Sequence, residues 1–161
     1  LRNMYDLILK ELKDNAVLVQ ERSSLTKSIN IQSEGENNHV NADIVALHSL
    51  STHALETAIS SQLFWDLTPN VQDVMFKLLR AVNGYNKVFG HARELRDSII
   101  LNKTHKQTTE KLLADYESAL NKYNQDINDL SKQLQDLIHT ETSKGILGVF
   151  RSKHKDDEGH S

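Results

Sequence analysis

The most regular feature of the sequence is an apolar repeat toward its C-terminal end. Eight residues follow one another in steps of 3, 4, 3, 4, 3, 4 and 3: Leu113, Tyr116, Leu120, Tyr123, Ile127, Leu130, Leu134 and Leu137. This heptad spacing puts all eight on one stripe of an α-helix. It predicts a long helix over about residues 105–140 whose apolar stripe, the heptad seam, is covered by other helices of the chain. The alternative is that part of the seam pairs with another chain.

Three further segments have helical periodicity. Residues 2–29 carry apolar side chains at spacings near three, four and seven, which predicts one amphipathic helix. The hydroxyls of Ser51 and Thr52 precede good helix formers, which predicts a short helix that stops near residue 66. Thr68 and Pro69 form a capping pair, and the pattern behind them predicts a third long helix to about residue 101. Gly84 is the expected site of a kink in that helix.

These segments predict an all-α fold, an antiparallel helical bundle of three long helices and one short one. The domain is expected to cover residues 1–143, with an exposed loop over about 32–48, where turn-forming residues predominate. Residues 144–161 are expected to lie outside it, as an apolar hexapeptide (145–150) and a disordered charged tail (151–161). The hexapeptide would fold back on the bundle as a flap or contact an anionic bilayer.

The composition argues against several kinds of chemistry. The chain has no cysteine and lacks the common enzyme signatures, so we expect no catalytic residues and no cofactor. A di-metal bundle needs two Glu-x-x-His pairs, and the sequence has one, Glu36 with His39 in the polar loop; Asp136 with His139 is only a near-match, so no metal site is expected. Between positions 106 and 141 the chain has four lysines and seven acidic residues. This excess of negative charge disfavours nucleic-acid binding.

Two polar residues interrupt the apolar face of the first helix. Glu11 and Asn15 are one turn apart and lie on the same broad face as Ile8. An unpaired polar group there would cost on the order of 1–3 kcal/mol, so both need partners. The free N–H groups at the start of the short helix, around residues 51–55, are the obvious donors. We therefore predict a structural polar clamp made of Glu11, Asn15, Ser51 and Thr52; the alternative is that the pair binds a ligand.

Three stretches resemble a loose family of uncharacterised prokaryotic proteins. They are residues 5–15 (YDLILKELKDN), residues 50–63 (LSTHALETAISSQL) and Tyr85-Asn86, so the resemblance covers residues 5 to about 90. In that family one or two N-terminal transmembrane helices lead directly into a helix with a Glu-x-x-x-Asn pattern. The resemblance implies a membrane anchor before Leu1 and no enzymatic activity. Arg2, Lys10 and Lys13 would then favour the cytoplasmic side.

These observations lead to one expected function and two alternatives. The chain is expected to be the soluble, cytoplasmic part of a membrane-anchored protein, acting in interaction or scaffolding with a protein partner that the sequence does not identify. One alternative is a ligand-binding sensor bundle, which would show a pocket with convergent polar groups between its helices. The other is a soluble coiled-coil oligomerisation module, a homo-oligomer joined through the last long helix.

Overall fold

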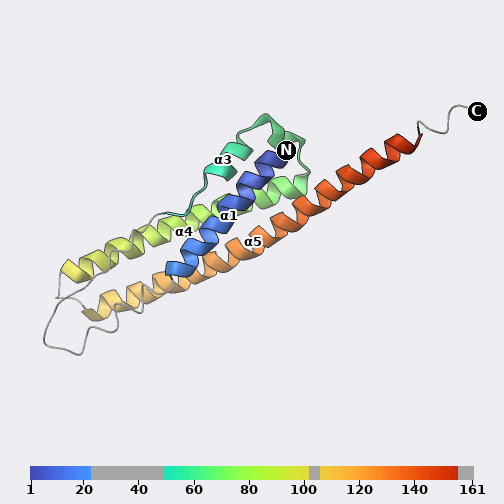
Figure 1. Ribbon diagram of the computed structural model, residues 1–161. Helices are drawn as coiled ribbons and strands as arrows, with labels where there is room; N and C mark the ends of the chain where they lie inside the picture. The colour runs from blue at the N-terminus through green and yellow to red at the C-terminus, as the bar shows by residue number, and fades with distance from the viewer. Residues whose placement is uncertain (23–48, 102–105, 156–161) are drawn as a thin grey trace, which may run out of the picture.

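The computed structural model describes residues 1–22, 49–101 and 106–155, and all regular structure in these ranges is helical (Figure 1). The elements are α1 (Arg2–Arg22), α3 (His53–Ile59), a short 3₁₀ helix η1 (Gln62–Asp66), α4 (Pro69–Leu101) and α5 (Lys106–Lys155). No strand occurs in the described ranges, so the fold is all-α, as the sequence predicted. None of the described helices is long and apolar enough to cross a membrane.

The long helices α4 and α5 lie side by side and run in opposite directions (Figure 1). Helix α1 runs in the same general direction as α4 and packs against both α5 and α3. The short α3 is placed between α1 and α4, with contacts to each. The C-terminal part of α5 projects past the other helices (Figure 1).

All these elements contribute to a single hydrophobic core. Helix α4 supplies its largest share, because Val71, Met75, Leu78 and Val82 recur every three or four residues and are fully buried. The remaining fully buried apolar side chains come from α1, α3, η1 and α5: Ile8, Leu55, Phe64 and Leu134. The short elements α3 and η1 are therefore part of the core and not a surface decoration.

The helix boundaries agree with the sequence in part. α4 begins at Pro69 and ends at Leu101, as predicted. The single short helix expected up to residue 66 is instead divided into α3 and η1, because the backbone of Ser61 is extended (φ −82°, ψ 153°). The expected end of the first helix at residue 29 and the loop over 32–48 lie outside the described residues.

The C-terminal segment differs from the expectation in its secondary structure. α5 continues to Lys155, so residues 145–150 are helical and form no flap, while the domain boundary at residue 143 stays a prediction. A helix commonly ends at a glycine in the left-handed conformation, and no glycine in the described residues has a positive φ. Gly145 and Gly148 are therefore helical and give no stop signal. Of the tail expected to be disordered, 151–155 is helical and 156–161 lies outside the described residues.

Candidate functional site

Glu11 on α1 caps the N-terminus of α3. Its Oε2 accepts hydrogen bonds from the Ser51 hydroxyl at 2.6 Å and from the Ala54 N–H at 2.8 Å, and its Oε1 accepts one from the Leu55 N–H at 3.2 Å. Glu11 is only 8% exposed, so these bonds replace its solvent shell. The carboxylate also places negative charge where a helix carries its positive end. The hydrogen bonds expected between Glu11 and the backbone around 51–55 are thus present.

Asn15 and a second asparagine, Asn86 on α4, hold the extended segment that leads into α3. Asn15 Nδ2 donates to the Ser51 carbonyl and Asn15 Oδ1 accepts from the Ser51 N–H, both at 2.8 Å. Asn86 makes the same pair of bonds with the neighbouring residue: Nδ2 donates to the Leu50 carbonyl at 2.8 Å, and Oδ1 accepts from the Leu50 N–H at 2.7 Å. Each side-chain amide therefore binds one backbone residue as a strand neighbour would.

Asn86 had no predicted role, although the sequence contained a signal for it. It follows the fully buried Val82 by four residues and precedes the buried Phe89 by three, so it borders the apolar face of α4. The argument that assigned partners to Glu11 and Asn15 applies equally to an amide in this position.

The two hydroxyls predicted to cap α3 behave differently from expectation. Thr52 does occupy the N-cap position, but its side chain makes no capping bond and donates to Glu56 Oε1 at 2.9 Å. The Ser51 hydroxyl accepts a long bond of 3.4 Å from the His53 N–H while it donates to Glu11. Because a carboxylate on another helix satisfies the free N–H groups, neither local hydroxyl is needed as the main cap.

The capping pair Thr68 and Pro69 stands at the start of α4, and Thr68 also contacts α5. The Thr68 carbonyl accepts the first helical bond, from the Gln72 N–H at 3.1 Å. Its hydroxyl donates to Glu141 Oε1 at 2.5 Å, and the Tyr5 hydroxyl donates to Glu141 Oε2 at 2.9 Å. Glu141 therefore joins the start of α1, the start of α4 and the C-terminal half of α5.

This environment changes the acidity of Tyr5. Burial, the hydrogen bond to Glu141 and the negative charge of that carboxylate all raise the pKa of the Tyr5 phenol well above its ordinary value of 10.0. Tyr5 is therefore a hydrogen-bond donor throughout the physiological pH range.

The heptad seam is largely covered within the chain. Six of its eight residues belong to the core or pack against it: Leu120, Tyr123, Ile127, Leu130, Leu134 and Leu137. Tyr116 lies with its ring 6.3 Å from that of His91 on α4, and Leu113 is half-buried. This coverage leaves little of the seam for a second chain.

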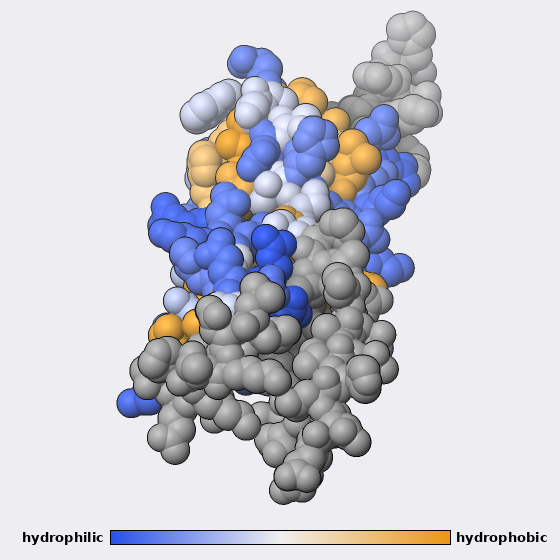
Figure 2. Space-filling view, turned by 90° about the vertical axis from the view of Figure 1, so that its left-hand side faces the viewer, coloured by the Kyte–Doolittle hydropathy of each residue, from blue (hydrophilic) through white to orange (hydrophobic). Residues whose placement is uncertain are grey.

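Three large apolar side chains are exposed on η1 and near the start of α4, and we name them the aromatic patch: Leu63, Trp65 and Phe76. They are 42%, 68% and 45% exposed. The rings of Trp65 and Phe76 both pack edge-on against the buried Phe64, at centroid distances of 5.5 and 5.1 Å, so both rest on the same core side chain. Figure 2 shows one face of the molecule, on which the coloured residues are mainly hydrophilic, with hydrophobic areas in the upper part and a smaller one lower at the left.

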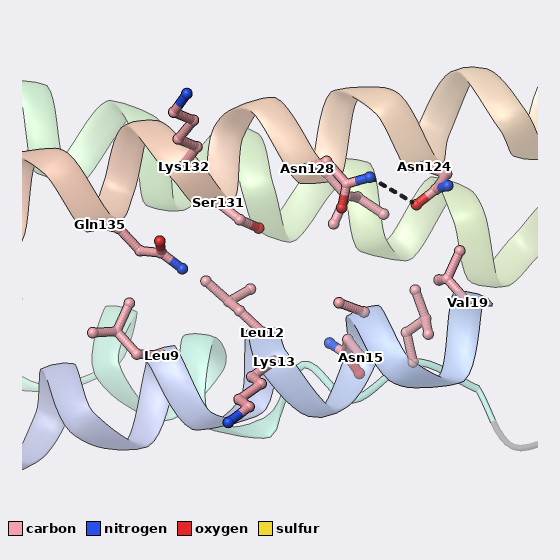
Figure 3. A pocket seen from close by; sticks show the side chains of 13 residues that line it. Leu9, Leu12, Lys13, Asn15, Val19, Asn124, Asn128, Ser131, Lys132 and Gln135 are labelled. Atoms are coloured by element: carbon pink, nitrogen blue, oxygen red, sulfur yellow. Dashed lines mark hydrogen bonds between the residues drawn. The ribbon is translucent and has the colours of Figure 1, made fainter. Parts of the chain in front are cut away.

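A groove with a volume of about 640 Å³ lies between α1 and α5 (Figure 3). Its α1 wall is mainly apolar and includes Leu9, Leu12, Ala16 and Val19. Its α5 wall is mainly polar and includes Asn124, Asn128, Ser131 and Gln135. Figure 3 shows Leu12 directed toward α5 and Gln135 directed toward α1, so both walls present side chains to the same space.

No metal centre is visible in the described part of the chain, where no three His, Asp or Glu side chains are grouped to hold an ion. Asp136 and His139 are both exposed on α5, and Glu36 and His39 lie outside the described residues. In comparisons with known proteins, no family model, no curated protein and no solved structure matches this chain.

Proposed function

We propose that this chain is a non-enzymatic interaction or scaffolding domain, the soluble part of a membrane-anchored protein, built as an antiparallel bundle of three long helices and one short one. The observation that carries the proposal is the aromatic patch. Trp and Phe are enriched where proteins bind partners, and both residue types are exposed here. The patch rests on the buried Phe64 and is therefore held on a packed core.

The position of the patch supports an anchored domain. Glu141 binds both Tyr5 in the first turn of α1 and Thr68 at the start of α4, so Leu1 and the aromatic patch lie at the same end of the molecule. A transmembrane segment before Leu1 would hold this end at the bilayer surface. Trp65 suits that position, because the amphipathic indole ring favours membrane interfaces. Arg2, Lys10 and Lys13 favour the cytoplasmic side.

The patch can be tested by site-specific photo-cross-linking in cells that express the full-length protein. A photoreactive phenylalanine at position 65 should give one discrete cross-linked protein. The same residue at position 121, an exposed asparagine on α5, should not give that product. The same cell extracts test the anchor, since the protein should stay in the membrane pellet after alkaline washing. Identical cross-linking patterns from both positions, or full release by the wash, would contradict the proposal.

A second candidate function is a ligand-binding sensor bundle, and the groove between α1 and α5 favours it. Ligand sites are typically concave, largely apolar and lined by a few polar groups, with volumes of roughly 300–1,000 Å³. The groove has this composition and, at about 640 Å³, this size. A rise in melting temperature on addition of a ligand would support a sensor role.

A further inference from the structure

The groove between α1 and α5 has a charge opposite to that of the protein. The whole chain carries a net charge of −3, yet the ionisable residues that line the groove are two lysines, Lys13 on α1 and Lys132 on α5. No aspartate or glutamate belongs to its lining. Neither lysine forms an ion pair with another residue in the described parts of the chain. The groove is therefore a local positive site that is available to an anion.

The two walls recognise different parts of a ligand. Along α1 the apolar side chains from Leu9 to Val19 span ten residues, which is about 15 Å of helix. This length fits a hydrocarbon chain lying parallel to the helix axis. Opposite it, the amides of Asn124 and Asn128 are already bonded to each other at 3.3 Å, whereas Ser131 and Gln135 lie further along the same wall.

We propose that this groove binds a small amphiphilic anion, a single-chain carboxylate of the fatty-acid type, with its chain against α1 and its acidic head held by Lys13 and Lys132. Figure 3 shows both lysine side chains directed away from the groove and in opposite directions, so each has to rotate about its side-chain bonds to reach a head group. Lysine has a long, flexible side chain, so each can turn toward a head group that lies at the rim. The inference is independent of the interaction role proposed for the aromatic patch.

The test compares two ligands with the same alkyl chain, dodecanoate and dodecyltrimethylammonium, by isothermal titration calorimetry below their micelle concentrations. Dodecanoate should bind one per chain and at least about tenfold more tightly than the cation, because only the carboxylate can accept charge-assisted hydrogen bonds from the two lysines. Equal binding of the anion and the cation would overturn the proposal, since the alkyl chain alone would then account for the affinity.

Two double variants separate the groove lysines from general surface charge. Lys13→Gln with Lys132→Gln should raise the Kd for dodecanoate about tenfold. Lys10→Gln with Lys122→Gln makes the same charge change on the same two helices, at exposed positions outside the groove, and should leave the Kd unchanged. If both double variants bind dodecanoate equally, the site is not formed by the groove lysines and the proposal fails.

Ala16→Leu tests the apolar wall. Ala16 lines the groove and is solvent-exposed, so the larger side chain fills the groove without entering the core. The variant should keep the circular dichroism spectrum of the wild type and lose dodecanoate binding. Unchanged binding would overturn the proposal. Light scattering that shows a wild-type dimer converted to a monomer by Ala16→Leu would also overturn it, because the groove would then be the seat of a second copy of the chain.

Discussion

The same substitution at two glycines of α4 should have different effects on stability. A methyl group added at Gly84 would lie 2.5 Å from Cε1 and 2.6 Å from Cζ of the Tyr123 ring, whereas one added at Gly90 would meet no atom within 4 Å. Contacts below 3.0 Å essentially do not occur for real Cβ atoms. Gly84 is therefore the point at which α5 approaches α4 through an aromatic side chain, and Gly90 has no such role.

The magnitude follows from two opposing effects. Replacing glycine by alanine inside a helix favours the folded state by about 1 kcal/mol. At Gly90 this gain should appear in full. At Gly84 it is opposed by overpacking, which costs about 1–3 kcal/mol because the Tyr123 ring must move. We therefore expect Gly90→Ala to be stabilising, Gly84→Ala to be neutral or destabilising, and the two to differ by about 1–3 kcal/mol.

Urea unfolding followed by circular dichroism measures this difference, since both variants keep the same helix and the same slope of free energy against denaturant. A second comparison identifies the cause. In a Tyr123→Leu background the ring is gone, and Gly84→Ala should then be as stabilising as Gly90→Ala. If Gly84→Ala stabilises the otherwise wild-type protein by the same amount as Gly90→Ala, the close approach of Tyr123 to α4 is not present and the reasoning is refuted.

Three further predictions concern the polar contacts. Glu11→Gln should destabilise the protein by about 2–4 kcal/mol in urea unfolding, because one amide N–H₂ then faces backbone donors and the negative charge at the start of α3 is lost. The exposed control Glu94→Gln should change the free energy of unfolding by less than about 0.5 kcal/mol. Asn86→Leu should cost about 2–4 kcal/mol, since it leaves the N–H and C=O of Leu50 unpaired, and a cost below about 0.5 kcal/mol would contradict that contact. Because the pKa of the Tyr5 phenol is raised in the folded state, its contribution to the free energy of unfolding is complete below pH 10.0 and is lost as the pH rises through the folded-state value. In an alkaline absorbance titration, the phenol that ionises at the highest pH should be absent from Tyr5→Phe. An unchanged titration would contradict the shift.

The sequence predicted those features that depend on local signals or on the cost of burial. Proline at position 69 marks the start of α4 because its missing N–H and fixed φ suit the first helical turn. Glu11 and Asn15 could be given partners because a polar group on an apolar face must be satisfied. In both cases the physical requirement can be read from one short segment.

Other features depend on contacts that no short segment specifies. Asn86 binds the backbone of a residue 36 positions earlier, so its role follows only from the path of the chain between α3 and α4. The bonds of Glu141 to Tyr5 and Thr68 depend in the same way on which helices lie beside α5. The end of α5 was misplaced for a different reason: the predicted helix was ended where the heptad repeat stops, at Leu137, whereas the helix continues to Lys155 without that repeat.

The polar contacts also explain why the groove can persist beside a well-packed core. A helix held only by apolar contacts would be free to shift toward α5, because this would remove more of its apolar wall from water. α1 is instead fixed by directional bonds, through Asn15 and Glu11 to the start of α3 and through Tyr5 to Glu141 on α5. Moving α1 toward α5 along the groove would break the bonds to Ser51 and Ala54 and leave buried donors unpaired. The clamp thus sets the separation of α1 and α5, and the space that it keeps open is the groove to which we assign an amphiphilic anion.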